Sequence, residues 1–475
     1  MLENALWTIA ELLTATGGRL LGKVSRPLNG VVIDSRVVAP GDIFVAIKGD
    51  KLDGHEFAVS ALSSGAGLAI VSVVTEEMLA AGPLLVVPHD PLLAMENIGR
   101  AARHRCSARI IAITGSVGKT STKEMLRVAL SATGATHASV ASFNNHWGVP
   151  LTLARLQKHD AFAVFEIGMN HAGEITPLVA MVGPQIAIIT SIAPSHLGQF
   201  DSLDGIAAAK AEIFSGVEKG GHAIVPRDSE YFGFLQNAAR TAGINSIVSF
   251  GRHERSDVRL ERVALHQSCC CITADVLGER VTYKLGTPGE HMAVNSLAVL
   301  AAVKLSGADL ARGALALAEA KPAKGRGVQQ SLKAPGGEIL LIDESYNANP
   351  TSVKAALSLL AHVKPVKGGR RIAVLGDMLE LGKFGPEMHA AIEKDIAAFG
   401  IDKLYAAGPL MSHLWRATPT SRRGAYAETS ADLKDEVLNA IHAGDCVMIK
   451  GSNGSRMGLI GEAMRVKWPV IEKEI

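Results

Sequence analysis

The 475-residue sequence has few cysteines, and none of them forms a CxxC pair. The five cysteines are an odd number, and three of them are contiguous at Cys269–Cys271. This pattern excludes a disulfide framework and a zinc site built on paired cysteines, and it predicts reduced thiols in a cytosol. The sequence also has no apolar run of the ~18 residues that a membrane-spanning helix needs.

A strong charge of either sign is also missing. The formal net charge is +2, which excludes a whole-protein field suited to nucleic acid. The first residues, MLENALWTIAELL, carry Glu3 and Glu11 but no basic segment, so they predict an amphipathic helix and no signal peptide. We therefore expect a cytoplasmic monomer that binds neither nucleic acid nor a membrane.

The most informative stretch is Ile110–Lys123, IIAITGSVGKTSTK. An apolar run, a glycine-containing loop and helical spacing follow one another, which predicts a strand, a phosphate-binding loop and a helix. Lys119 would reach the β- and γ-phosphates of a nucleotide, and the Thr120 hydroxyl would hold Mg²⁺. The alternative is a glycine turn with a surface lysine. The residues expected around the phosphates are Gly115, Ser116, Val117, Gly118, Lys119, Thr120 and Ser121.

Alternation of strand and helix patterns predicts an α/β fold with three domains. We expect a small α/β N-terminal domain over 1–105, a central P-loop doubly wound sheet over 106–328, and a C-terminal Rossmann-like domain over 329–475. The expected strands are Val31–Ile33, Asp42–Ile47, Leu68–Val71, Leu84–Val87, Ile110–Ile113, Ala161–Phe165, Ile186–Ser191, Ile339–Ile342, Ile372–Leu375, Leu404–Ala406 and Val447–Ile449. The expected helices include Asp90–Arg105, Ser202–Val217, Ser352–Leu360, Glu387–Phe399 and Ala431–Ile441.

Polar residues follow several of these strands. Ligands bind beyond the carboxyl ends of strands in such sheets, so Glu166 and His196 are candidates to approach the Mg²⁺ held by Thr120. The alternative for His196 is an ordinary surface or core histidine. In the first unit the residues at strand ends are Asp34, Ser35, Arg36 and Lys48. They are candidate binding residues, and the equal alternative is that they are solvated residues of ordinary turns.

Lys210 lies on the apolar face of its predicted helix, i+4 from Ile206 and i−4 from Phe214. Burial of an ammonium lowers its pKa, and a neutral amine is a nucleophile. Such an amine can accept CO₂ and become a carbamate, an oxygen ligand for a hard cation. On the residues alone, a snorkelling lysine whose stem covers apolar surface is the favoured interpretation.

A series of motifs resembles those of the Mur ligases, the ATP-dependent amide-forming enzymes of peptidoglycan synthesis, in the same order and across all three units. The motifs are TGSVGKTS, Asn144-Asn145, Glu166-Ile167-Gly168, His196-Leu197, the segment 209–214, Gly289-Glu290-His291 with Asn295, and Gly325-Arg326. Within the family the sequence is most similar to the member that adds D-alanyl-D-alanine. That similarity is carried by DSRVVAPGDIFVAIKGDKLDGHEF, EIGMNHAGEI, DESYNANPTS and LGDMLELG, and by the absence of a DNPR motif.

The resemblance implies roles for individual residues. ATP would bind through the glycine loop, with Asn295 facing the adenine and with Arg326 and Asp343 completing the nucleotide site. Two Mg²⁺ ions would be served by Thr120, Glu166, His196 and a carbamylated Lys210. The catalytic set would be Lys119, Lys210, His196 and Arg326. Sugar-nucleotide and peptide contacts would come from Asp34, Ser35, Arg36, Lys48, Asn145, Tyr346, Asn347 and Asn349.

The implied reaction joins UDP-N-acetylmuramoyl-tripeptide to D-alanyl-D-alanine. The tripeptide carboxylate would attack the γ-phosphate of ATP to give an acyl phosphate, and the dipeptide amine would then displace phosphate. One alternative is a mechanical or switch P-loop NTPase, because Ile339–Glu344 looks like a Walker B strand. Others are a folylpolyglutamate synthetase-like ligase, which would lack the first unit, and a non-catalytic nucleotide-binding scaffold.

Overall fold

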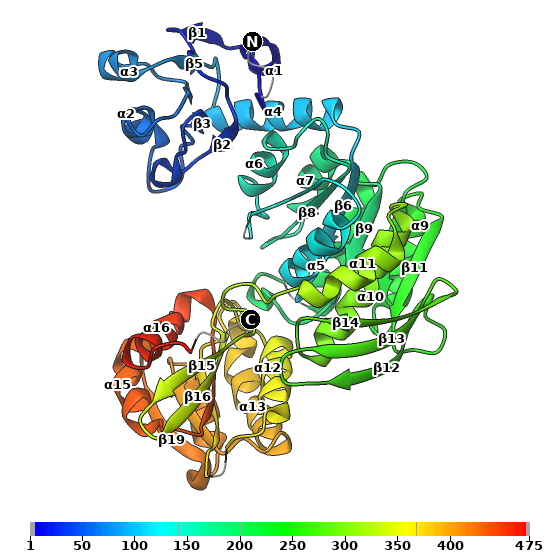
Figure 1. The fold of residues 1–475 in the computed structure, drawn as a ribbon, viewed down its shortest axis with the longest axis vertical. Coiled ribbons are helices and arrows are strands. Elements are labelled where there is room, and N and C mark those ends of the chain that lie inside the picture. The colour runs from blue at the N-terminus through cyan, green and yellow to red at the C-terminus, as the bar shows by residue number, and fades with distance from the viewer. Residues whose placement is uncertain (1–4, 141, 201, 367, 472–475) are drawn as a thin grey trace.

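The computed structural model describes residues 5–140, 142–200, 202–366 and 368–471. Three α/β units, each with its own sheet, succeed one another along the chain, and the first and third lie at opposite ends of the molecule (Figure 1). The expected three-domain α/β fold is confirmed. In the described ranges, no helix combines the length and apolar character needed to cross a bilayer.

The first unit holds a five-stranded sheet in the order β1-β5-β4-β3-β2, parallel except for the β1–β5 pair. Four of its strands match the expected ones, and β1 was not predicted. The helix expected over the first residues begins only at Ile9, because Thr8 caps it and exchanges hydrogen bonds with Glu11; residues 1–4 of that prediction lie outside the described ranges. The elements are α1 (Ile9–Thr16), β1 (Arg19–Leu21), β2 (Gly30–Val32), β3 (Asp42–Val45), α2 (Ala58–Ser63), β4 (Leu68–Val71), α3 (Glu76–Ala81), β5 (Leu84–Val86) and α4 (Pro91–Arg105).

The central unit is organised around β6, which is buried on both faces of a nine-stranded sheet. Ile110 and Ala112 pack into one apolar core, whereas Ile111 and Ile113 pack into the other. The strand order is β14-β13-β12-β11-β10-β9-β6-β8-β7, and the pairs from β7 to β12 are parallel. The elements are β6 (Arg109–Thr114), α5 (Lys119–Ser131), β7 (Thr136–Ala138), α6 (Gly148–Ala154), β8 (Phe162–Glu166), α7 (Ile175–Val182), β9 (Ile186–Ile189), α8 (Leu203–Ala211), β10 (His222–Pro226), α9 (Phe232–Thr241), β11 (Ser246–Gly251), β12 (Val258–Leu265), β13 (Cys270–Val276), β14 (Glu279–Leu285), α10 (Glu290–Leu305) and α11 (Leu310–Ala316).

This unit differs from expectation in several strands and in one helix. The strands β7, β10 and β11 were not predicted, and neither were β12, β13 and β14, whose antiparallel pairs extend the parallel sheet at one edge. The helix predicted over Ser202–Val217 is shorter, because α8 ends at Ala211 and a 3-10 turn follows over Glu212–Gly216. The Glu212 carboxylate there accepts backbone hydrogen bonds from Gly173 and Thr176, which ties this turn to the start of α7.

The third unit is a six-stranded sheet in the order β15-β16-β20-β17-β18-β19, parallel except for the β15–β16 pair. Helices cover both faces, with α15 and α16 contributing to one apolar core and α12 and α13 to the other. The elements are β15 (Val328–Ala334), β16 (Gly337–Glu344), α12 (Pro350–His362), β17 (Arg371–Gly376), α13 (Gly385–Ala398), β18 (Lys403–Ala407), α14 (Met411–Ala417), β19 (Arg423–Ala427), α15 (Ser430–Ala440), β20 (Cys446–Lys450) and α16 (Gly458–Lys467). The four expected strands are present.

Candidate active site

The loop between β6 and α5 depends on two glycines. Gly118 has a φ of 90° and starts α5, and a Cβ there would lie 2.5 Å from the Asn295 side-chain nitrogen. A Cβ on Gly115 would lie 1.9 Å from the Thr190 hydroxyl, which itself donates to the Val117 carbonyl at 2.6 Å. The loop is thus pressed against the end of β9, where the Ser116 and Val117 N–H groups donate to Ser191. The loop leads directly into the N-terminus of α5, the kind of position where anions bind.

Lys119 folds back over this loop. Its ammonium donates to the Gly115 carbonyl at 2.6 Å. Burial lowers the pKa of Lys119 and the nearby Arg326 charge adds to this effect, while Glu166 opposes it. A lysine held this way can exchange the Gly115 carbonyl for an incoming anion as its hydrogen-bond acceptor.

Glu166 ends β8 beside the loop, as predicted for a ligand site at strand ends. Its carboxylate is buried, and one oxygen accepts a hydrogen bond from the Asn144 amide at 2.7 Å. The other oxygen has no hydrogen-bond partner among the described residues. A buried carboxylate oxygen without a partner is costly, and a hard cation is the kind of ligand that satisfies it. Thr120 and His196 line the same cavity.

Lys210 is 2% exposed on α8, so the snorkelling lysine favoured on the residues alone is wrong, and the side chain is buried on the apolar stripe. Burial lowers its pKa well below the ordinary range, and the nearby Lys119 charge lowers it further. Within the described residues its amine makes no hydrogen bond. Lys210 is therefore a buried amine biased toward the neutral form, which is the requirement for carbamate formation.

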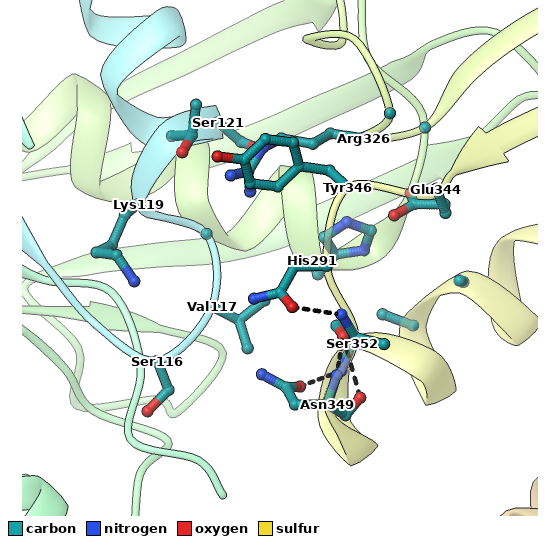
Figure 2. A pocket seen from close by; sticks show the side chains of 18 of the residues that line it. Ser116, Val117, Lys119, Ser121, His291, Arg326, Glu344, Tyr346, Asn349 and Ser352 are labelled. Carbon is teal, nitrogen blue, oxygen red and sulfur yellow. Dashed lines mark hydrogen bonds between the residues drawn. The ribbon is translucent and has the colours of Figure 1, made fainter. Parts of the chain in front are cut away.

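A cavity of about 270 Å³ separates the glycine loop from the third unit (Figure 2). Lys119 and Val117 lie on one side, and the start of α12 lies on the other. Asn349 caps α12 and exchanges hydrogen bonds with Ser352. At one edge the Arg326 guanidinium stacks over the Tyr346 ring at 4.1 Å, and Arg326 also donates to Ser142 at 3.4 Å. The third unit thus supplies one wall of a site whose other wall is the phosphate-binding loop.

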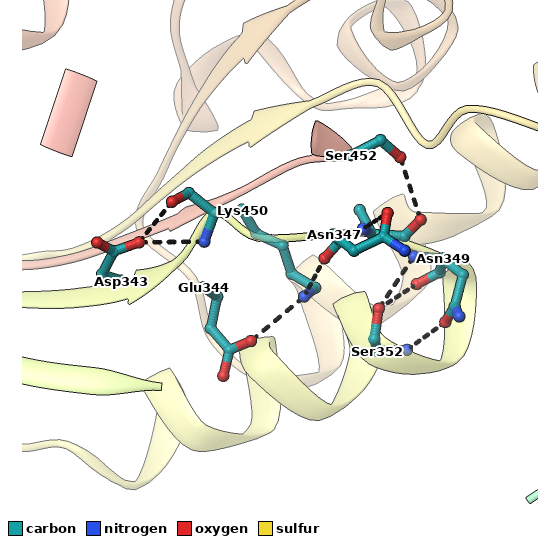
Figure 3. Close-up of polar contacts among 9 residues, drawn as sticks. Asp343, Glu344, Asn347, Asn349, Ser352, Lys450 and Ser452 are labelled. Atoms are coloured by element: carbon teal, nitrogen blue, oxygen red, sulfur yellow. Dashed lines mark hydrogen bonds and ion pairs between the residues drawn. The ribbon is translucent and has the colours of Figure 1, made fainter. Parts of the chain in front are cut away.

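Lys450 and Glu344 also line this cavity, and the sequence analysis assigned neither a role. They end the neighbouring parallel strands β20 and β16 (Figure 3). The buried Lys450 ammonium lies 3.3 Å from the Glu344 carboxylate and donates to the Asn347 carbonyl at 2.9 Å. Burial lowers the pKa of Lys450, and Glu344 opposes this shift. The sequence did contain one signal for Lys450, since it is a lysine that directly follows the apolar run Val447–Ile449.

The other predicted nucleotide residues are divided between two further cavities. Asn295 lies against Gly118 and lines a cavity with Thr190 and His291. Asp343 lines a different one, where it accepts hydrogen bonds from Arg465 at 2.5 Å and from the Ser345 hydroxyl at 2.6 Å. Burial raises the pKa of Asp343, but these two partners outweigh it and the net shift is downward.

Residues predicted to contact the substrate fall into two groups. Tyr346, Asn347 and Asn349 line the cavity beside the loop. Asn145 accepts backbone hydrogen bonds at the start of α6, while its neighbour Asn144 faces the cavity. The remaining four lie in the first unit, away from the glycine loop, and include an exposed pair in which Arg36 donates to Asp34 at 2.6 Å; they are Asp34, Ser35, Arg36 and Lys48.

Three family models match successive parts of the chain. They are described as the Mur ligase family catalytic domain at residues 27–103, the Mur ligase middle domain at 113–303, and the Mur ligase glutamate ligase domain at 330–453. Together they follow the order of the three sheets.

Relatives match over nearly the whole length. The UDP-N-acetylmuramoyl-tripeptide–D-alanyl-D-alanine ligase of Escherichia coli K12 is 33% identical, with 96% of this chain and 98% of that protein aligned. The Bacillus subtilis protein of the same name is 30% identical, over 96% and 97%. A crystal structure of MurF from Acinetobacter baumannii superposes with a TM-score of 0.82 at 31% identity, covering 96% of this chain and 98% of that one. The MurF ligase of Thermotoga maritima in complex with ADP shares the fold, with a TM-score of 0.74 at 23% identity.

Proposed function

This chain belongs to the Mur ligase family, and we propose that it joins D-alanyl-D-alanine to UDP-N-acetylmuramoyl-tripeptide at the expense of ATP. The product is the pentapeptide precursor of peptidoglycan, and ADP and phosphate are released. The relatives that align over nearly the full length carry that activity in their names. As in the sequence analysis, the protein is expected to work as a cytoplasmic monomer.

The observation that carries the proposal is the cavity between two units. The glycine loop with Lys119 and Glu166 forms one wall, and Tyr346 with Asn349 belongs to the other. ATP phosphates at the first wall and an acceptor amine at the second would meet inside it. We retain the domain bounds 1–105, 106–328 and 329–475, with the sugar nucleotide on the first, ATP on the second and the dipeptide on the third.

The chemistry requires a carboxylate to approach a triphosphate, which is a like-charge encounter. Lys119 would leave the Gly115 carbonyl and donate to the transferring phosphoryl group. Arg326, which lies between the second and third units, would offset the negative charge of the same group. The attack of the tripeptide carboxylate gives an acyl phosphate and ADP. The dipeptide amine then attacks the acyl carbon, and the carbon–oxygen bond to phosphate breaks.

Thr120, Glu166 and His196 fit a magnesium site, since Glu166 keeps a buried oxygen without a partner in the described part of the chain. Mg²⁺ bound there would neutralise triphosphate charge. A second Mg²⁺ fits only if Lys210 becomes a carbamate, for which its buried, unpartnered amine is suited. The carbamate would add an anionic oxygen ligand that no encoded side chain supplies.

The arrangement of the sheets weighs against a mechanical or switch NTPase. In those proteins the Walker B aspartate lies on a strand of the sheet that holds the glycine loop. Here Asp343 is the last residue but one of β16, in a separate sheet, and it pairs with Arg465. The five-stranded sheet of the first unit weighs against a folylpolyglutamate synthetase-like ligase.

The test is phosphate release from ATP with purified protein, UDP-N-acetylmuramoyl-tripeptide and D-alanyl-D-alanine. Turnover should require both substrates, and each single omission should abolish it. Equal turnover with diaminopimelate or glutamate as acceptor would overturn the dipeptide specificity and leave the ligase class standing. Hydrolysis that needs neither substrate would overturn the ligase assignment itself.

A further inference from the structure

A contact joins the central and third units beside the cavity. The His196 Nδ1 lies 2.5 Å from a carboxylate oxygen of Glu380. Directly next to it, the Gly198 N–H donates to the Glu380 carbonyl at 2.7 Å. The two backbones come so close that a Cβ on Gly198 would lie 2.9 Å from the Gly382 nitrogen. Side chain and backbone thus meet at one point of the domain interface.

Both partners adopt an uncommon backbone conformation. His196 has a φ of 57° and Glu380 a φ of 66°, in the left-handed region that non-glycine residues seldom occupy. Such conformations persist where the surroundings fix them, and they cluster at functional sites. Here the left-handed residues face each other across the interface, so the contact is set by the backbone on each side.

The third unit anchors the residues just before Glu380. The preceding residues follow β17, and the Met378 N–H donates to the buried His389 at 2.9 Å. The Leu379 N–H donates to the Ser452 hydroxyl at 2.9 Å, and the Asp377 carboxylate accepts from the Met411 N–H at 2.8 Å. The residues just before Glu380 are therefore anchored to two helices and a loop of their own domain by hydrogen bonds on several sides.

We propose that Glu380 is a positioning residue for His196, supplied from the third domain to the magnesium site of the central domain. Histidines that bind metals usually donate their second ring N–H to a carboxylate, which fixes the tautomer and orientation. In this structure the 2.5 Å approach of Nδ1 to Glu380 is an ion-pair contact, and Nδ1 makes no hydrogen bond among the described residues. When Nδ1 donates to Glu380, Nε2 is the nitrogen left for a cation in the cavity that His196 lines. The site is then complete only while the third domain is docked. This inference rests on the proposed function for its metal.

The test compares Glu380→Gln with Glu387→Gln in the full chain. Glu387 is an exposed carboxylate on α13 of the same domain, seven residues further on, and it makes no ion pair in the described structure. Nitrogen NMR of ¹⁵N-histidine-labelled protein reports the ring tautomer, and His196→Gln identifies the signal. Titration of Mn²⁺ in the presence of ADP, followed by electron paramagnetic resonance, reports the cation site. Steady-state kinetics gives kcat and KM separately.

Glu380→Gln should move the His196 signals away from the Nδ1–H tautomer. It should weaken Mn²⁺ binding and lower kcat by about 10–100-fold, the range for partners of metal ligands, with the KM for sugar nucleotide unchanged. Glu387→Gln should match the wild type in all three. Unchanged His196 signals, or unchanged Mn²⁺ affinity in Glu380→Gln, would overturn the inference. Loss of dipeptide dependence in the wild type would instead count against the proposed function.

Discussion

Lys210 is a lysine whose surroundings disfavour its charge. It is buried on α8, with Lys119 nearby and no hydrogen-bond partner among the described residues. If it carries a carbamate, Lys210→Ala should lower kcat at least tenfold by leaving a cation underliganded, and a small carboxylic acid such as acetate should restore part of the rate. The check is phosphate release with and without acetate or bicarbonate. A Lys210→Ala enzyme of normal rate would exclude the carbamate.

The same burial predicts a pH-dependent stability effect. The pKa of Lys210 is lowered in the folded state, so the unfolded chain binds more protons between the two pKa values, and stability rises with pH across that range. In bicarbonate-free buffer, Lys210→Met should therefore raise the melting temperature at pH 7. The gain should shrink as the pH approaches ~10.4, the unfolded pKa of lysine. Lys304→Met, at a half-buried lysine that pairs with Glu279, is the control and should show no such gain. A pH-independent difference would contradict the argument.

Individual residues were predictable where one segment alone positions them. The position of Glu166 follows from a strand end within a few residues of sequence. The helix stripe places Lys210 among apolar residues, but it did not decide between burial and snorkelling. Lys450 and Glu344 were not assigned, because their pairing depends on β20 lying beside β16, about a hundred positions earlier in the chain. Glu380 was missed for the same reason, since its partner His196 belongs to another domain.

At the scale of elements, the conformation of the loop between β6 and α5 predicts that Gly118 cannot be replaced without loss of function. Gly118→Ala adds a Cβ 2.5 Å from the Asn295 nitrogen and forces an alanine to a φ of 90°. Gly278→Ala, in the turn between β13 and β14, carries a similar backbone strain at a φ of 82° with open space around it. Both should lose about 1–2 kcal/mol of stability. Only Gly118→Ala should also lose most ATP binding and turnover.

Chemical denaturation and nucleotide titration would separate these effects. If both variants bound ATP as well as the wild type, the loop would not be the phosphate site. If Gly278→Ala lost ATP binding, backbone strain in a turn outside the loop would be enough to disturb the site, and the effect of Gly118→Ala could not be assigned to the loop.

Most strands with a strong apolar pattern were predicted, although the buried run 223–225 of β10 was missed. β6, β8 and β9 are buried on both faces, so their apolar runs stand out in the sequence. The strands β12 and β14 mix buried, half-buried and exposed residues toward the edge of the sheet, and their polar residues hid them. The early end of α8 could not be predicted, because it depends on Glu212 contacting Gly173, in a loop before α7.

For the whole molecule, the decisive fact is that the predicted binding residues are spread over three sheets. Asp34 and Arg36 lie in the first unit, the glycine loop in the second and Tyr346 in the third, and Figure 1 places the first and third units at opposite ends. The contact between His196 and Glu380 already joins the second and third units. If the sugar nucleotide binds at the first unit as proposed, its peptide carboxylate must still reach the proposed ATP site in the second unit.

Domain closure should therefore accompany binding of both ligands. Small-angle scattering of the full chain should give a smaller radius of gyration with a non-hydrolysable ATP analogue and UDP-N-acetylmuramoyl-tripeptide together than with either ligand alone. The Lys119→Ala variant should keep the larger radius of gyration with both ligands, because it lacks the ammonium that would hold the phosphates next to the sugar nucleotide's carboxylate. A radius that stays constant in the wild type under saturating ligands would show that the site is preassembled, and the first unit would then have to deliver the tripeptide without moving.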